Sequence, residues 1–165
     1  MNDTMNDTRR HFLAGLAAST ILGLTGIGRA LAETVEKLVL SEDAWRKRLS
    51  SARYNILRKE GTERPYSSPL NNEKRAGTYH CAGCELALFD SSTKYDSGTG
   101  WPSFYDIIPG HVGTKSDYKI LFPRTEYHCK RCGGHQGHVF KDGPQPTGLR
   151  YCNNGLALTF NPKTS

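Results

Sequence analysis

Apolar residues recur at helical spacing over residues 41–59. Trp45, Leu49 and Leu57 are separated by four and eight positions, so they would share one face of a helix and leave charged side chains on the other. Ser41 precedes the first apolar residue and suits an N-cap, because its hydroxyl can accept a hydrogen bond from a free backbone N–H. The pattern predicts a single helix from Ser41 to Lys59.

Beyond residue 60 the pattern changes to short apolar runs separated by turn residues. Gly, Pro, Asn and Asp recur too often there for long helices, and the runs between them favour strands. The predicted strands are Thr78–His80, Leu86–Phe89, Ser103–Ile107, Tyr118–Phe122, Glu126–His128, His138–Phe140, Arg150–Tyr151 with its continuation, and Ala157–Phe160. We therefore expect one mainly β domain with a helical lead-in.

The start of the chain has a pattern of a different kind. Arg9 and Arg10 are followed by small and apolar residues from Phe12 to Ile27, and then by the segment Ala-Leu-Ala at 30–32. A positive start, an apolar middle and a small-residue end are typical of a cleaved export signal. The paired arginines before Phe-Leu resemble a twin-arginine signal.

This pattern predicts that residues 1–32 are removed and that a single domain over 33–165 remains. It places the protein in the periplasm or otherwise outside the cytoplasm, with no stable membrane association after cleavage. The alternative is an uncleaved N-terminal anchor, although the apolar run is short and rich in glycine. Both methionines, Met1 and Met5, lie in the predicted signal, so the mature domain would contain none.

Composition narrows the class of protein. The chain has 165 residues, of which 36% are hydrophobic and 23% charged, which suits one globular domain and excludes a coiled coil or a highly charged disordered chain. The formal net charge is +6, but Lys and Arg are scattered, which indicates a solvated surface and no nucleic-acid partner. The five cysteines are an odd number, so at least one thiol lies outside any intramolecular disulfide.

Four of the cysteines form two matched pairs. Cys81 and Cys84, and likewise Cys129 and Cys132, are separated by two residues, and each pair follows Tyr-His. One tight turn can aim two such sulfurs at one ion, and two turns supply the tetrahedral sulfur set of a structural Zn²⁺ site. Structural disulfides are the main alternative in an oxidising compartment, and a thioredoxin-like redox centre would explain only one pair.

The fifth cysteine, Cys152, lies in a run of polar and charged residues. Arg150 and Asn154 are each two positions away, so on a strand all three side chains would share one face. A guanidinium beside a thiol favours the thiolate, so we expect the pKa of Cys152 to be lowered from about 8.5. The alternative is an inert, buried cysteine.

Two further segments carry side chains suited to chemistry. His135 and His138 follow the second cysteine pair and could act as acid, base or orienting groups beside a thiolate. Trp101 lies on a turn between glycine and proline, where its ring could form an apolar wall for a small group. Histidines at the surface and a tryptophan in the core are the simpler alternatives.

Three blocks, GWPSF from Gly100, CGGHQGHVF from Cys132 and RYCNN from Arg150, resemble the signatures of the B-type methionine sulfoxide reductases. RKEGTERP at 58–65 and the two cysteine pairs extend this resemblance. It implies a mainly β fold of two antiparallel sheets that form an open, barrel-like core, with short N-terminal helices and one structural zinc remote from the catalytic cysteine.

The resemblance also implies a reaction, the reduction of methionine-R-sulfoxide, protein-bound or free, by a peptide-methionine (R)-S-oxide reductase. Cys152 would attack the sulfoxide sulfur and become a sulfenic acid. The remaining side chains would donate protons, polarise the surroundings or bind the substrate methyl group; they are His135, His138, Asn154, Arg150, Trp101 and Phe140.

One position departs from many relatives, because Thr99 stands where they carry a resolving cysteine. Four metal ligands and one nucleophile use all five cysteines. We therefore expect an external thiol reductant, such as a thioredoxin-like protein, to recycle Cys152. The alternative function is a non-catalytic, zinc-clamped β module that binds a small ligand.

Overall fold

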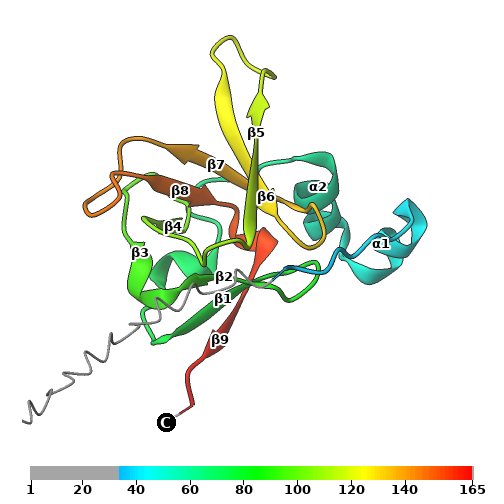
Figure 1. Cartoon of the computed structure of the whole chain (residues 1–165), viewed down its shortest axis with the longest axis horizontal. Coiled ribbons are helices and arrows are strands. Elements are labelled where there is room, and N and C mark those ends of the chain that lie inside the picture. The colour runs from blue at the N-terminus through cyan, green and yellow to red at the C-terminus, as the bar shows by residue number, and fades with distance from the viewer. Residues whose placement is uncertain (1–33, 165) are drawn as a thin grey trace, which may run out of the picture. The chain divides into compact units, whose positions relative to one another are not determined.

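The computed structural model describes residues 34–164, so the predicted export signal at 1–32 lies outside the described residues. The helices and strands are α1 (Glu42–Arg48), α2 (Ser51–Lys59), β1 (Gly77–Cys81), β2 (Ala87–Asp90), β3 (Lys94–Tyr95), β4 (Ser103–Phe104), β5 (Val112–Asp117), β6 (Arg124–Cys129), β7 (His135–Phe140), β8 (Arg150–Asn153) and β9 (Leu158–Pro162) (Figure 1). In this part of the chain no helix has the length and apolar character needed to cross a membrane.

The predicted single helix is two helices in the structure. Ser41 caps α1 as expected, and its side chain accepts a hydrogen bond from the backbone N–H of Ala44 at 3.2 Å. The backbone then becomes extended at Leu49, and Ser50 caps α2 by accepting from the N–H of Arg53 at 3.3 Å. The apolar spacing continued through this break, which hid the second serine cap.

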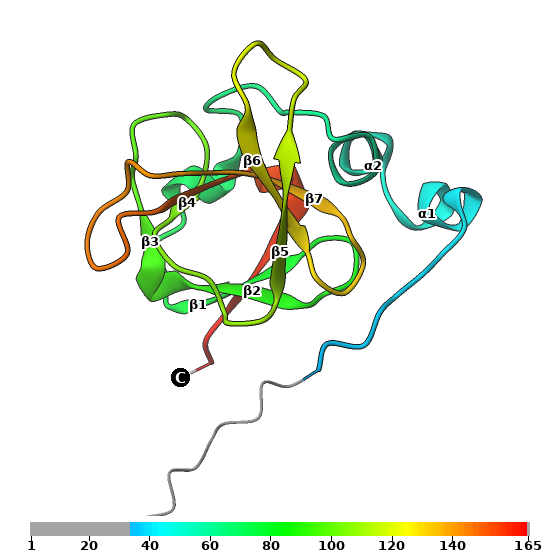
Figure 2. The same cartoon turned by 45° about the horizontal axis from the view of Figure 1, so that its top comes forward.

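The strands form two antiparallel sheets, as predicted. The smaller sheet has the order β2-β1-β9, and the larger sheet has the order β3-β4-β8-β7-β6-β5 (Figure 2). No described strand pairs β3 with β5, so the larger sheet stays open. Its central strands, β7 and β8, are hydrogen-bonded on both sides and hold their side chains firmly in register.

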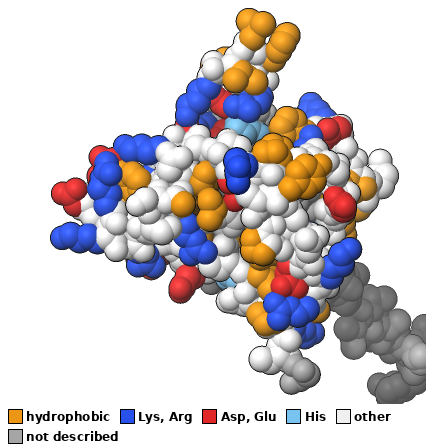
Figure 3. Space-filling model, turned by 180° about the vertical axis from the view of Figure 1, so that it is seen from behind, with side chains coloured by type: hydrophobic (Ala, Val, Ile, Leu, Met, Phe, Trp, Pro, Cys, Tyr) orange, Lys and Arg blue, Asp and Glu red, His pale blue; other side chains and the backbone are white. Residues whose placement is uncertain are grey.

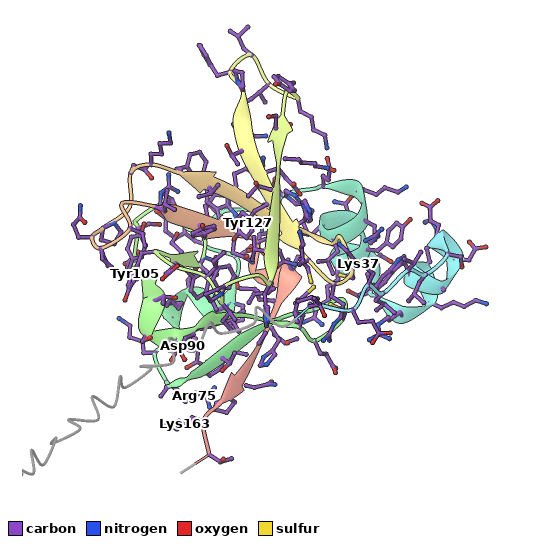
Figure 4. All side chains as sticks on the ribbon, viewed as in Figure 1. Lys37, Arg75, Asp90, Tyr105, Tyr127 and Lys163 are labelled. Carbon is purple, nitrogen blue, oxygen red and sulfur yellow. The ribbon has the colours of Figure 1, made fainter. Side chains whose placement is uncertain are left out.

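An aromatic core lies between the two sheets. Phe89 of β2 stacks on Phe104 of β4 with ring centroids 4.0 Å apart, and Tyr79 of β1 packs edge-on against Phe104 at 4.9 Å. Tyr127 of β6 and Tyr151 of β8 extend the cluster; Tyr127 lies near the centre of the molecule (Figure 4). These rings join the sheets and fix the strands that carry the candidate site.

Two strand predictions need correction. Tyr118–Phe122 is not a strand but the loop between β5 and β6, and the predicted strand Ser103–Ile107 contains only the two residues of β4. The Asp117 side chain accepts a hydrogen bond from the backbone N–H of Lys119 at 2.9 Å, which turns the chain where the apolar run begins. The true strand, β5, lies at the sheet edge and is largely exposed, so no apolar alternation marked it.

Candidate active site and metal cluster

The two cysteine pairs lie on turns of the same geometry. In each turn the backbone N–H four residues after the first cysteine donates to that cysteine's carbonyl, Glu85 to Cys81 at 2.8 Å and Gly133 to Cys129 at 2.9 Å. Glu85 and Gly133 both have positive φ, 64° and 68°, which closes each turn tightly. The matching sequence context thus produces two matching turns.

These turns bring the four sulfurs into one buried cluster. The Sγ atoms of Cys81, Cys84, Cys129 and Cys132 all lie within 4.8 Å of one another. Cys81 and Cys132 are 3.7 Å apart, and Cys84 and Cys129 are 3.4 Å apart. Tetrahedral zinc with Zn–S bonds of about 2.3 Å requires sulfurs roughly 3.8 Å apart. The donor set and its spacing therefore fit a tetrahedral metal ion.

Positive side chains surround the backbone of this cluster. Arg48 of α1 donates to the carbonyl of Gly83 at 2.9 Å, and Arg58 of α2 donates to the carbonyl of Cys132 at 2.9 Å. Hydrogen bonding among the neighbouring thiols, together with burial, raises the pKa of Cys81 well above its ordinary value. Four thiolates around a divalent ion carry a net negative charge, which these guanidinium groups offset.

Cys152 lies in a separate cavity of about 130 Å³ at the larger sheet. The residues that line it are Thr62, Trp101, Arg124, Gly137, His138, Phe140, Cys152, Asn153 and Asn154. Five of the seven residues predicted for catalysis or substrate binding are in this set; His135 and Arg150 are not. A larger surface hollow beside β9 has no cysteine or histidine in its lining.

Strand pairing places the reactive groups of the cavity. Cys152 of β8 is the direct cross-strand partner of His138 on β7. Gly137 permits this close approach, because a Cβ atom there would lie 1.9 Å from the carbonyl oxygen of Cys152. Trp101 reaches the same cavity from the loop before β4, and its indole Nε1 donates to the carbonyl of Glu63 at 3.1 Å. The indole is thereby fixed beside the thiol.

The expected lowering of the Cys152 pKa is wrong for this structure. Burial raises the pKa of the thiol, and the Arg150 guanidinium and the Thr99 hydroxyl offset only part of that rise. Arg150 makes two hydrogen bonds of 2.8 Å to Asp142 and lies over the ring of Phe140 at 4.3 Å. Because its charge is already paired, Arg150 holds Phe140 rather than fully activating the thiol.

His138 belongs to a polar group that the sequence did not reveal. Its Nε2 lies 2.7 Å from a carboxylate oxygen of Asp117, and Arg124 donates to the same carboxylate at 2.7 Å. The hydrogen bond from the backbone of Lys119, and then that from His138, holds the pKa of Asp117 well below its ordinary value. Burial lowers the pKa of His138, and the hydrogen bond to Asp117 opposes this only in part.

His135 lies beside the cavity rather than in its wall. The side chain is 2% exposed, and its Nδ1 lies 2.8 Å from Glu126. Burial pushes the pKa of Glu126 upward, but hydrogen bonds with His128 and His135 bring it down to about 2. The ring centroids of His135 and His138 are 5.5 Å apart. His135 is therefore placed to support His138 rather than to touch a ligand in the cavity.

The side chains of Asn154 and Glu63 hold backbone segments next to the cavity in place. The Asn154 side chain accepts from the backbone N–H of Glu63 at 3.0 Å and donates to the carbonyl of Gln136 at 3.1 Å. The Glu63 carboxylate accepts from the backbone N–H groups of Gly155 and Leu156. Glu63 was not singled out from the sequence, although it lies within the RKEGTERP segment at 58–65.

Thr99, which stands at the position expected for a resolving cysteine, lies beside the Cys152 sulfur. Its Oγ1 is 4.0 Å from the Cys152 sulfur, and its other neighbour is the hydroxyl of Ser97 at 2.8 Å. The five described cysteines are all free of disulfides. This loop therefore presents hydroxyl groups, not a thiol, to the reactive sulfur.

A thiol opposite a histidine–carboxylate pair in an aromatic-walled cavity forms a candidate active site for cysteine chemistry, here on a β fold with a four-cysteine cluster that could hold a metal ion. Sequence comparison agrees, because residues 49–162 match the SelR domain. The chain therefore belongs to the SelR family of B-type methionine sulfoxide reductases.

The chain is similar to bacterial and archaeal proteins named peptide methionine sulfoxide reductase MsrB. It is 50% identical to that of Bradyrhizobium diazoefficiens over 131 residues, 79% of this chain and 94% of the relative. The relative from Methanosarcina barkeri is 51% identical over 78% of this chain and 89% of its own length. The relative from Pseudomonas putida is 49% identical over 78% and 98%.

Proposed function

We propose that this enzyme reduces methionine-R-sulfoxide, free or in proteins, to methionine, with Cys152 as the nucleophile. One observation carries this proposal: Cys152 and His138 are cross-strand partners in a cavity walled by Trp101 and Phe140. The aromatic side chains suit the methyl group of the substrate, and the polar wall suits the sulfoxide oxygen. Trp101 would fix the epimer that reacts, because it allows the methyl group only one place.

His138 is well suited to move the proton that this reaction needs. The ionised Asp117 can only accept a hydrogen bond, so Nε2 of His138 carries a hydrogen atom; in the neutral ring Nδ1 then has a free lone pair. The raised pKa of Cys152 and the lowered pKa of His138 favour a thiol beside a neutral imidazole. Imidazole takes the thiol proton as the sulfur attacks, and the imidazolium then protonates the sulfoxide oxygen.

The atoms balance in two half-reactions. In the first, the sulfoxide oxygen passes to Cys152; methionine leaves, and the thiol becomes a sulfenic acid. In the second, one external thiol displaces water from the sulfenic acid to form a mixed disulfide, and a second external thiol releases Cys152 as a thiol. The hydroxyl of Thr99 beside the sulfur supports an external reductant, such as a thioredoxin-like protein.

The metal in the four-cysteine cluster is proposed to be zinc. Four thiolates with near-tetrahedral spacing favour a soft, tetrahedral ion, and zinc has no redox chemistry that would consume the enzyme's reductant. Its contribution would be to hold two distant turns together. None of the catalytic steps above requires it.

Export is proposed from the sequence pattern alone. Paired arginines, an apolar run and a small-residue end over residues 1–32 support a cleaved twin-arginine signal and a periplasmic or otherwise exported enzyme over residues 33–165. We expect Edman sequencing of the exported protein to give an N-terminus at Glu33. A protein retained in the membrane with an intact N-terminus would refute cleavage.

The test of the activity uses the two separated sulfoxide epimers with a small dithiol as reductant. We expect turnover of the R epimer and no turnover of the S epimer. Turnover of the S epimer alone would refute the assignment. Binding of a sulfoxide without any turnover would favour the non-catalytic ligand-binding module instead.

A second measurement tests the recycling step. One equivalent of substrate is added without reductant, and the protein is treated with a reagent that traps sulfenic acids. The mass of the protein is then measured. We expect one trapped adduct on Cys152. An intramolecular disulfide that includes Cys152 in the metal-loaded protein would contradict recycling by an external thiol.

A further inference from the structure

The hairpin of β5 and β6 ends in an exposed apolar surface, which we call the apolar tip. It consists of Tyr118, Ile120, Leu121 and Phe122, whose side chains are 74%, 49%, 88% and 72% exposed. In residues 34–164 the structure has six exposed large apolar side chains, and four of them are in this loop. The hairpin projects from the rest of the domain in two views (Figures 1 and 2), and apolar side chains gather at its end (Figure 3).

Folding of the domain does not account for this surface. Pairing of the two strands ends at Asp117 and Arg124, and the loop beyond them lies outside the sheet. Its side chains are not among the residues that pack in the core. Apolar groups that cluster on a soluble protein without burial commonly mark a binding surface.

The apolar tip is directly connected to the catalytic cavity. Asp117, the last residue of β5, holds His138 through the 2.7 Å hydrogen bond. Arg124, the first residue of β6, is part of the cavity lining. Arg124 lines the cavity and Asp117 holds one of its lining residues, so the base of the loop that carries the apolar tip lies at the cavity.

The size of the cavity limits what can enter it. Its volume of about 130 Å³ accommodates one side chain, so the rest of a polypeptide substrate must lie on the surface around the entrance. Methionine is an apolar residue that folded proteins bury, so an unfolded chain exposes other buried apolar residues together with it. An apolar surface on a loop whose base lies at the cavity matches such a chain.

Charge around the apolar tip favours this partner over an anionic surface. Lys115 of β5 and Lys119, which lies within the loop, are both paired with the carboxylate of Glu60. Arg124 is paired with Asp117. These pairs reduce the positive charge available to an acidic lipid headgroup, and the exposed side chains beyond them remain apolar.

We propose that the apolar tip is a docking surface for unfolded polypeptide, and that it binds the apolar residues that flank an oxidised methionine while the sulfoxide side chain enters the cavity. This inference rests on the proposed function and adds a binding surface for its polypeptide substrates. The surface offers an unfolded polypeptide contacts away from the reacting atoms.

The test compares two substrates and two variants. The tip variant is Leu121→Ser with Phe122→Ser, and the control is Val39→Ser, because Val39 and Leu121 are both 88% exposed. The substrates are N-acetyl-methionine-R-sulfoxide and chemically oxidised, unfolded casein. We expect the tip variant to lose about tenfold in kcat/KM on casein, as two apolar contacts are removed, and to keep wild-type kcat/KM on the small substrate.

Each other outcome refutes a stated part of the argument. Equal losses on both substrates would mean that the loop shapes the cavity, and unchanged rates on casein would mean that it binds no polypeptide; both overturn the docking surface. An equal loss with Val39→Ser would make the effect general rather than local.

Two further results would assign the surface to another partner. One is a dimer in the wild type but a monomer in the tip variant, and the other is vesicle binding that is lost only in the tip variant. Failure of the wild type on both substrates would refute the proposed function itself, and with it this inference.

Discussion

The cysteines of this domain occupy two regions that are built in different ways. In the four-cysteine cluster, each cysteine pair lies on one tight turn of five residues. Both turns have the same backbone hydrogen bond and a positive φ at the fifth residue, Glu85 or Gly133. Around Cys152 the imidazole, indole and carboxylate come from distant parts of the sequence: His138 from the neighbouring strand, Trp101 from the loop before β4, and Asp117, which contacts His138, from the far edge of the sheet. Local sequence encodes the first region, and the assembled sheet creates the second.

The two regions also treat their sulfurs differently. The cluster sulfurs are buried together near Arg48 and Arg58, an arrangement that stabilises thiolates once a divalent ion is bound. Cys152 is partly buried beside a neutral histidine, and its pKa is raised. The first arrangement suits a permanent structural role, whereas the second favours a thiol over a thiolate. Gln136 joins them, because its side chain donates to the Cys81 sulfur at 3.4 Å and its carbonyl accepts from Asn154.

The largest expected effect comes from loss of a metal ligand. Cys129→Ser removes one of four sulfurs from the cluster, so the turns at the ends of β1 and β6 are no longer held together. Structural zinc sites contribute on the order of 10 kcal/mol, which is comparable to the whole stability of a domain. We expect the variant to be largely unfolded by circular dichroism and to contain no metal by elemental analysis. A metal-free variant with wild-type melting temperature would contradict this.

The second prediction applies the same substitution to the other region. Cys152→Ser should lower R-epimer reduction by at least about a thousandfold, because the hydroxyl cannot replace the nucleophilic sulfur. Its free energy of unfolding should change by no more than about 1 kcal/mol, since the exchange is nearly isosteric and the side chain is only partly buried. Steady-state kinetics and thermal melts check both parts. A folded variant that retains activity, or one that loses its metal, would remove the distinction between the two regions.

What could be predicted from the sequence follows the same division. The four-cysteine cluster could be predicted because two residues between thiols, with glycine at or near the turn, determine a local geometry. Most strands could be predicted because short apolar runs are bounded by turn residues, whereas the two-sheet class followed from the resemblance to the B-type methionine sulfoxide reductases. Features encoded within about ten residues were therefore accessible.

Features that depend on the assembled sheet were not accessible. The sequence did not reveal Asp117, because β5 is an exposed edge strand with no apolar alternation and the apolar run after it predicts a strand. The pKa of Cys152 was expected to fall because Arg150 is near in sequence; burial, which no sequence pattern reports, outweighs that charge. His135 and His138 looked equivalent, but register places only His138 opposite Cys152.

The third prediction tests whether Asp117 positions His138 for the proposed proton transfer. Asp117→Asn keeps the shape but removes the charge, so the amide no longer favours the His138 tautomer with hydrogen on Nε2. We expect about a tenfold fall in kcat/KM, in keeping with loss of a partner that orients a catalytic ring. The carboxylate raises the pKa of His138 against the effect of burial, so its removal should lower that pKa further and shift the acidic limb of the pH profile to lower pH.

Asp90 supplies the matched control for this measurement. Its side chain accepts from the backbone N–H two residues ahead at 2.8 Å, as the Asp117 side chain does at 2.9 Å. No histidine contacts Asp90 among the hydrogen bonds of the described residues. Asp90→Asn should therefore leave both kcat/KM and the acidic limb unchanged. If both variants shift the profile equally, Asp117 acts through the turn and not through His138.

The smallest expected effect comes from a substitution that makes the second region resemble the first. Thr99→Cys places a thiol where Oγ1 lies 4.0 Å from the Cys152 sulfur, on a loop whose glycines at 98 and 100 both have positive φ and so allow the backbone to adjust. After one equivalent of R sulfoxide without reductant, this variant should lose the mass of two hydrogen atoms, because cysteine 99 attacks the sulfenic acid and releases water. The wild type should instead gain one oxygen atom. Stability and turnover with a small dithiol should stay close to wild type, since neither His138 nor the cavity wall is altered.

Ser97→Cys is the control, because the Ser97 hydroxyl contacts Ser103 at 2.7 Å and has no hydrogen bond to the Cys152 sulfur. A stable sulfenic acid in Thr99→Cys would mean that proximity in the folded loop is insufficient for exchange, and that recycling is limited by access of the reductant rather than by the missing thiol.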